Sequence, residues 1–118
     1  MPLFKIYSLI WLNALAEKLE PIEMLALLVS SLCHDLAHDG FSNMYHINAQ
    51  TSLAQKYNDK SPLEMHHCAT AFRILSQEKF NILSSLNDIM FRKIRHLIIE
   101  YENYILFILK SLVIFIFS

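Results

Sequence analysis

Glycine and proline are scarce in this sequence: its 118 residues include one glycine and three prolines. These residues form the tight turns that connect the strands of a sheet, so their scarcity argues against a fold built from β-hairpins. Helices joined by short polar connectors need few of them. We therefore expect an all-α fold.

Cysteine and net charge are limited as well. Cys33 and Cys68 are the two cysteines, and each lies in an apolar helical pattern far from the other. This arrangement favours buried free thiols over a disulfide, and it predicts a cytoplasmic protein in a reducing compartment. A net charge of −1 gives no electrostatic reason to expect binding to nucleic acid or to an acidic membrane surface.

Hydrophobic residues, in contrast, make up 54% of the chain. A globule of this size cannot bury so much apolar surface by itself, so we expect it to need further covering surface. Three explanations remain open. The chain forms a homo-oligomer or pairs with a related protein, it contacts a membrane, or it is a fragment of a larger helical domain.

Apolar periodicity predicts helices along most of the chain. A rival interpretation of the first 20 residues is a secretory signal, because Lys5 precedes an apolar run and Ala14-Leu15-Ala16 resembles a cleavage site. Pro21 suits the first turn of a central helix, and Asn58-Asp59-Lys60 is typical of a turn. The expected helical segments are 3–20, 21–33, 44–50, 52–57, 62–75 and a last one that begins at Asn87 or Asp88.

Residues 104–117 are almost wholly apolar. They are too few to cross a bilayer comfortably, and Lys110 lies within them. Membrane contact through this segment is therefore a minor alternative.

Two imidazoles and two carboxylates follow the apolar central helix within six residues, as His34, Asp35, His38 and Asp39. An unpaired carboxylate beside a core is costly, and a divalent cation would remove that cost. His38 comes four residues after His34, which on a helix places both on one side. Gly40 suits the positive φ that ends such a helix. The pattern predicts a metal site at the helix end, although two histidines at this spacing also occur by chance.

Glu64 has two interpretations. After Ser61 and Pro62 it occupies the third position of a new helix, where it would complete a capping box with Ser61. His67 lies three residues later on roughly the same side of that helix, so both side chains could instead belong to the wall of a functional site.

The string from His34 to Asn43 resembles the H-D-x-x-H-x-G-x-x-N signature of class I 3′,5′-cyclic-nucleotide phosphodiesterases. Residues 47–68 resemble, without gaps, the family segment that follows the signature, and residues 91–98 resemble its F-x-x-I-R helix. The resemblance covers about residues 20–99. It implies a helical fragment of the all-α, HD-type catalytic domain of this family.

By resemblance, the site would hold two divalent ions, zinc and magnesium or manganese, that share a bridging hydroxide. His34 would bind the zinc, and Asp35 would bind both ions. His38 would lie beside the hydroxide, Glu64 would hold metal-bound water and a catalytic histidine, and His67 would lie near the phosphate. The implied reaction is hydrolysis of cAMP or cGMP to the 5′-monophosphate in signal transduction.

The sequence departs from the family pattern at both ends. The family's upstream segment, which supplies the general-acid histidine and a zinc-ligand histidine, has no counterpart in residues 1–20, and after Ile99 the A-T-D-M continuation is replaced. Ala37 stands where many members have aspartate. We therefore divide the chain into a partial phosphodiesterase domain, 1–99, and an apolar tail, 100–118.

These departures predict an enzyme fragment with little or no activity alone, because zinc ligands and the proton donor are both missing. One alternative is a non-catalytic protein that pairs with a full-length phosphodiesterase. The other is a membrane-associated helical protein.

Overall fold

The computed structural model describes Ser8 and residues 15–117. The helix expected over 3–20 lies largely outside the described residues, of which Leu15–Glu17 form a 3-10 turn, η1. No strand occurs among the described residues, so the expected all-α fold is confirmed. The remaining elements are α2 (Pro21–Cys33), α3 (Asn43–Asn48), α4 (Ser52–Lys56), α5 (Pro62–Leu75), η2 (Glu78–Phe80) and α6 (Asp88–Phe117).

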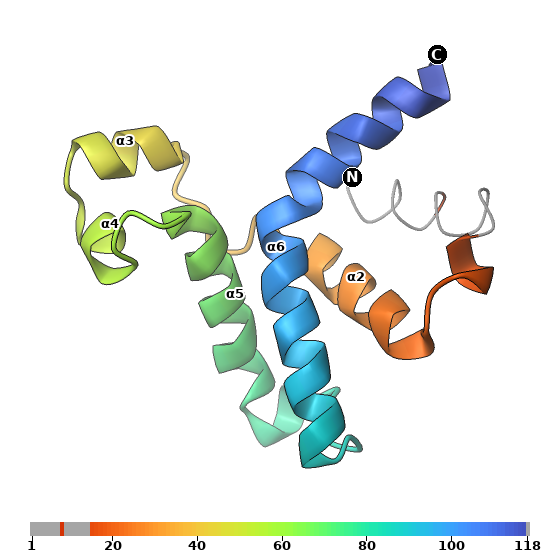
Figure 1. The fold of residues 1–118 in the computed structure, drawn as a ribbon. Helices are drawn as coiled ribbons and strands as arrows, with labels where there is room; N and C mark the ends of the chain where they lie inside the picture. Colours follow the sequence, from red (N-terminus) through yellow and green to blue (C-terminus); the bar gives the residue numbers. More distant parts are fainter. Residues whose placement is uncertain (1–7, 9–14, 118) are drawn as a thin grey trace.

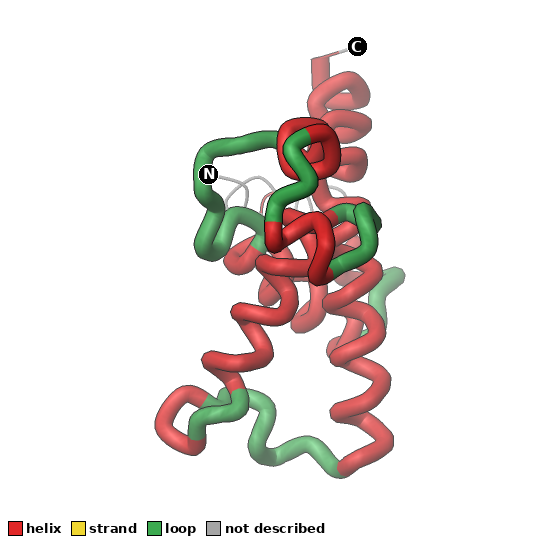
Figure 2. Tube along the Cα trace, turned by 90° about the vertical axis from the view of Figure 1, so that its left-hand side faces the viewer, coloured by secondary structure: helices red, strands yellow, loops and turns green. Residues whose placement is uncertain are grey.

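The helices are arranged around α6 (Figure 1). α5 runs antiparallel beside it, α2 packs against a different face of it, and α3 and α4 lie beyond the first turn of α5. In Figure 2 the connector between α5 and α6 closes the end of this pair that is opposite to α3 and α4. The C-terminal end of α2 and the N-terminal end of α5 therefore both lie beside the middle of α6.

Small and branched side chains build the contact between α2 and α6. Ala26 and Ser30 of α2 are fully buried, and their small size lets the helix approach Ile94 and Ile98 of α6, which are also fully buried. The Ser30 hydroxyl donates to the carbonyl oxygen of Ile98 (3.4 Å), so its polar group is satisfied. This contact fixes the end of α2, and the residues that follow it, against the middle of α6.

Several predicted boundaries are confirmed. Pro21 begins α2, and Asn87 caps α6 by accepting the N–H of Met90 (2.9 Å). Asn58 and Asp59 adopt positive φ angles of 53° and 61°, as expected of a turn.

The relation between His34 and His38 is different from the prediction. α2 ends at Cys33, so these two histidines are not one turn apart on a continuous helix. The chain passes through turns instead, and Ala37 takes a φ of 59°, a left-handed conformation that is unfavourable for alanine. Gly40 has the expected positive φ, 88°, but it lies in the loop beyond the helix.

α6 continues without a break from Asp88 to Phe117, across the point at which we divide the chain into domain and tail. That division stays a prediction. Within the part of the chain that the structure describes, no helix combines the length and the hydropathy that crossing a membrane requires.

Candidate metal centre and substrate cavity

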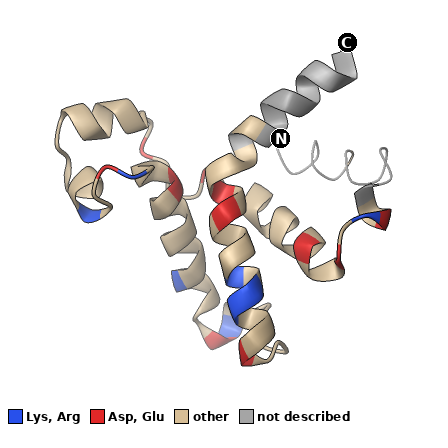
Figure 3. Cartoon of the chain, in the orientation of Figure 1, with Lys and Arg blue, Asp and Glu red and all other residues tan. Residues whose placement is uncertain are grey.

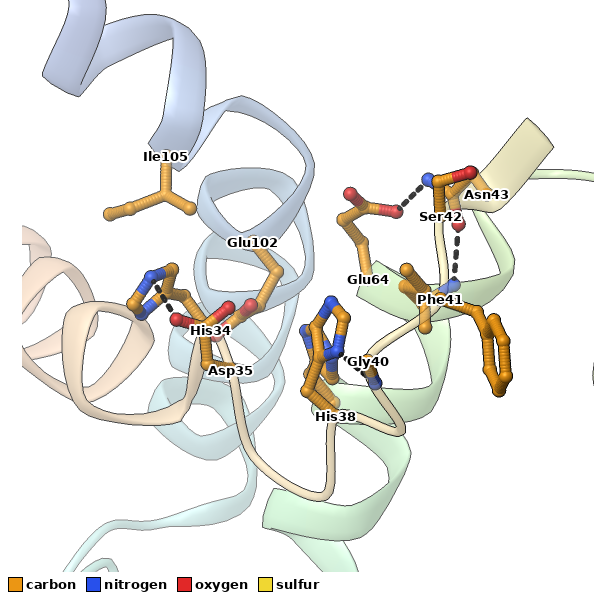
Figure 4. A pocket seen from close by; sticks show the side chains of 12 residues that line it. His34, Asp35, His38, Gly40, Phe41, Ser42, Asn43, Glu64, Glu102 and Ile105 are labelled. Carbon is orange, nitrogen blue, oxygen red and sulfur yellow. Dashed lines mark hydrogen bonds and ion pairs between the residues drawn. The ribbon is translucent and has the colours of Figure 1, made fainter. Parts of the chain in front are cut away.

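A cavity of about 410 Å³ lies where the loop after α2, the first turn of α5 and the middle of α6 meet (Figure 4). Small-molecule sites usually measure roughly 300–1,000 Å³. The five residues that the sequence predicts for the site all line this cavity, and a sixth titratable residue comes from α6: His34, Asp35, His38, Glu64, His67 and Glu102.

His34 and Asp35 form a close pair. Nε2 of His34 lies 2.9 Å from Oδ2 of Asp35, and Nδ1 of His34 lies 3.2 Å from the carbonyl oxygen of Ser31. The carbonyl can only accept, so Nδ1 carries the proton and donates it. In a neutral ring Nε2 then presents a lone pair to a carboxylate oxygen, and the two repel unless a proton or a metal ion lies between them. Metal-binding histidines are typically held in this way, with the other ring N–H on a backbone carbonyl.

His38 enters the cavity from the turn after α2. Its Nδ1 accepts the N–H of Gly40 (2.8 Å), so in the neutral ring Nε2 carries the proton. Its ring centroid lies 5.6 Å from that of His67. His38 can therefore offer an N–H donor to a ligand in the cavity.

Glu64 does not take part in a capping box. Ser61 has a left-handed backbone, with φ of 40°, and its side chain makes no capping hydrogen bond. Asn43 caps α5 instead, since its Oδ1 accepts the N–H of Leu63 (2.9 Å) while its Nδ2 donates to Oε2 of Glu64 (2.7 Å). The capping-box interpretation is wrong, and Asn43 holds the Glu64 carboxylate at the cavity.

His67 lines the cavity from α5 and is only 3% exposed. Among the described residues, neither of its ring nitrogens has a hydrogen-bond partner. Burial lowers the pKa of His67, and the neighbouring His38 lowers it further. A buried imidazole without a partner is costly, so a polar ligand that enters the cavity would satisfy it.

Glu102 is the cavity residue that sequence reasoning missed. It is 1% exposed, and neither carboxylate oxygen has a hydrogen-bond partner in the described part of the chain. Burial raises its pKa to about 8, and the carboxylates of Glu64 and Asp35 add to the rise. Figure 4 shows its side chain pointing from α6 toward Asp35. Sequence pattern gave no signal for this position, because an acidic residue on an amphipathic helix is normally assigned to the solvent face.

Asp39 and His46 support the loop without lining this cavity. His46 is 3% exposed, with Nδ1 2.9 Å from the Thr51 hydroxyl and Nε2 3.0 Å from Oδ2 of Asp39. The Phe41 N–H, and to a smaller extent His46, lower the pKa of Asp39. Of the two carboxylates in the sequence string, only Asp35 therefore lines the cavity.

The cavity gathers acidic side chains. Three carboxylates line it, from Asp35, Glu64 and Glu102, and its described lining includes no lysine or arginine. Figure 3 shows that the basic residues drawn in blue on α6 lie nearer to the start of the helix. A divalent cation would compensate these charges, and imidazole and carboxylate are suitable ligands for one. The described residues contain no group of three such side chains that could hold an ion as they stand. His34 and Asp35 are the predicted metal ligands, and their side chains already lie 2.9 Å apart.

Comparison with known proteins gives the family. The family model described as 3′5′-cyclic nucleotide phosphodiesterase matches residues 4–102. The chain belongs to this phosphodiesterase family. The resemblance read from the signature is confirmed, and membership implies the use of divalent metal ions in general.

Two phosphodiesterase sequences and one solved structure illustrate the relationship. The chain is 51% identical over 89 residues to the high affinity cGMP-specific 3′,5′-cyclic phosphodiesterase 9A of Mus musculus, a match that covers 75% of this chain and 17% of that protein. It is 42% identical over 85 residues to the 3′,5′-cyclic-nucleotide phosphodiesterase regA of Dictyostelium discoideum, with coverage of 72% and 11%. The phosphodiesterase domain of the RhoPDE fusion protein from the choanoflagellate Salpingoeca rosetta aligns with a TM-score of 0.79 at 37% identity, covering 86% of this chain and 32% of that chain.

The solved phosphodiesterase domain confirms the helical, HD-type fold class. The chain spans less than a fifth of the length of these two curated relatives and about a third of the solved chain. The individual roles of the five predicted site residues stay predictions.

Proposed function

We propose that this chain is part of a phosphodiesterase catalytic domain that hydrolyses a 3′,5′-cyclic nucleotide. The observation that carries the proposal is the arrangement of His34 and Asp35. Nδ1 of His34 donates to the Ser31 carbonyl, and Nε2 faces the Asp35 carboxylate at 2.9 Å. A proton or a metal ion between Nε2 and the carboxylate satisfies this pair, and a divalent cation would be bound by both side chains.

We propose Zn²⁺ and Mg²⁺, or Mn²⁺ in place of magnesium, as the ions that this pair binds. When bound, such ions polarise a phosphate and lower the pKa of a water molecule. One imidazole and one carboxylate are fewer than the four ligands of a structural zinc site. We therefore expect this chain to bind metal weakly by itself.

The remaining cavity residues prepare it for a phosphate. His38 offers Nε2–H as a donor, and the pKa of His67, lowered by burial, keeps that ring neutral and able to donate or accept. Glu64, held by Asn43, can accept hydrogen bonds from water. In hydrolysis, the oxygen of water adds to phosphorus, the bond from phosphorus to O3′ breaks, and O3′ leaves with a proton.

The source of that proton limits the activity of this chain alone. By resemblance the donor is a histidine of the upstream segment, and residues 1–20 contain no histidine. An unprotonated alkoxide is a poor leaving group, so we expect little or no hydrolysis without the rest of a catalytic domain.

We propose cGMP as the first substrate to test, because the mouse and human relatives are both named as cGMP-specific. We also propose a cytoplasmic location. The free thiols Cys33 and Cys68 support it, since such thiols persist in a reducing compartment.

A metal titration tests the centre. Zn²⁺ and Mn²⁺ are titrated by calorimetry into the wild type, His34→Ala and Asp35→Ala, with His96→Ala as a control whose side chain is 73% exposed. We expect His34→Ala and Asp35→Ala to weaken binding by about tenfold or more, and His96→Ala to leave it unchanged. Equal binding by the wild type and His34→Ala would refute the proposed centre.

A chimaera tests the catalytic part of the proposal. Residues 20–102 replace the matching segment of the mouse phosphodiesterase 9A, and cGMP hydrolysis is measured with and without His34→Ala. We expect an active chimaera that loses its activity with this substitution. A folded, metal-loaded chimaera without activity would refute catalytic competence.

A second candidate function, non-catalytic pairing with a full-length phosphodiesterase, is favoured by exposed apolar side chains. Leu32, Ile89 and Phe107 are 61%, 75% and 72% exposed. Light scattering of this chain, alone and mixed with an intact relative, distinguishes a monomer, a homo-oligomer and a mixed complex. A monomer that leaves the mass and the activity of the relative unchanged would exclude pairing.

A further inference from the structure

Glu102 has no role in the site that the family resemblance describes. It lies on α6, at the last residue that the family model matches. Its side chain is nevertheless 1% exposed, lines the cavity, and has no hydrogen-bond partner for either oxygen among the described residues. A buried carboxylate without a donor is strongly destabilising, so a cationic partner at this position would stabilise the fold.

The described groups around Glu102 do not supply that positive charge. The carboxylate of Asp35 faces it from the loop after α2, and that of Glu64 faces it from α5. The thiols of Cys33 on α2 and of Cys68 on α5 are also close to it. Arg95, on α6 itself, stacks its guanidinium on the Phe72 ring at 4.3 Å and is not among the residues that line the cavity. Among the residues that the structure describes, no side chain supplies that charge to Glu102, whereas a small cation from solution would.

We propose that Glu102 completes, together with His34 and Asp35, a binding site for one divalent cation. The inference rests on the proposed function, because it uses the same His34–Asp35 pair, but it adds a ligand that the family resemblance does not imply. One imidazole and two carboxylates are three protein ligands, the number found in open catalytic zinc sites. Carboxylate-rich ligand sets also suit Mn²⁺.

Glu102 reaches the ion by turning its side chain. In the described conformation, His34, Asp35 and Glu102 are not close enough together to hold an ion. Figure 4 shows, however, that the Glu102 side chain is directed toward Asp35. The side chain is flexible about its torsions, and its oxygens break no hydrogen bond when they move, because they have none in the described structure.

The test is Mn²⁺ titration of the whole chain by calorimetry. The variants are Glu102→Gln, which keeps the shape and removes the charge, and Glu102→Asp, which keeps the charge on a shorter side chain. Glu100→Gln is the matched control, since Glu100 is an exposed carboxylate two residues earlier on α6. Circular dichroism in EDTA checks that each variant is folded before metal is added.

We expect Glu102→Gln to weaken Mn²⁺ binding by about tenfold or more, Glu102→Asp to weaken it less, and Glu100→Gln to leave it unchanged. Wild-type affinity in folded Glu102→Gln, together with weak binding by His34→Ala, would overturn this inference and leave the proposed centre in place. Wild-type affinity in His34→Ala and Asp35→Ala would overturn both.

Discussion

Replacing Glu102 by glutamine should make the metal-free chain more stable, by an amount that grows with pH. The carboxyl has a pKa of about 8 in the folded chain, against an ordinary value of 4.5. The folded state therefore holds this proton more tightly than the unfolded state. Wild-type stability is fully present below pH 4.5 and is lost as pH rises through 8, whereas the glutamine variant has no such proton.

The size of the effect follows from the shift. One pKa unit corresponds to about 1.4 kcal/mol. The free energy of unfolding of the variant, minus that of the wild type, should therefore be about 3 kcal/mol larger at pH 7 than at pH 4.5, and up to about 4 kcal/mol larger well above pH 8. A difference of this size is a large part of the stability of a small domain.

Urea denaturation followed by circular dichroism, in EDTA at several pH values from 5 to 9, measures this difference. Glu100→Gln serves as the control, because its exposed side chain should give a difference from the wild type that does not grow in this way. A constant difference in the free energy of unfolding between wild type and Glu102→Gln across this range would mean that the carboxyl titrates alike in the folded and unfolded states, and would contradict the raised pKa of Glu102.

Three further predictions concern the backbone, the cap and the thiols. Ala37→Gly should raise the free energy of unfolding by about 1 kcal/mol, because Ala37 has a φ of 59° that glycine adopts without strain. The control Ala69→Gly, in the middle of α5, should lower it by a similar amount. Urea melts in which both substitutions are destabilising would contradict this. Asn43→Ala should lower the free energy of unfolding by about 2 kcal/mol, since it removes the cap of α5 and the donor to Glu64. Asn48→Ala, at an exposed position, is the control. Equal urea midpoints for the wild type and Asn43→Ala would count against this prediction. Burial raises the pKa of Cys33 and of Cys68 to about 11, so Ellman's reagent at pH 8 should react slowly with the folded chain and rapidly in urea; equally fast reaction in both states would disprove thiol burial.

The helices and the signature residues were accessible from the sequence because they depend on local order. The start of α2 follows from Pro21 and the start of α6 from Asn87, which are short-range signals. His34, Asp35 and His38 are close in sequence, so no long-range packing had to be predicted to group them.

Other features of the site depend on contacts that sequence spacing does not contain. The cap of α5 comes from Asn43, 20 positions before the N–H that it accepts, and it takes the place of a local capping box with Ser61. The chain turns at Ala37 although alanine favours a helix there, so helical spacing misplaced His38 relative to His34. Glu102 reaches the cavity only because α2 and α5 both pack against α6.

The most direct test of the metal centre is an anomalous diffraction map of a crystal of this chain soaked in Mn²⁺. We expect a peak that is about 2.2 Å from Nε2 of His34 and from the Asp35 carboxylate, with Nδ1 of His34 still donating to the Ser31 carbonyl. A map without a peak there, in which His34 and Asp35 remain directly hydrogen-bonded at saturating Mn²⁺, would contradict it.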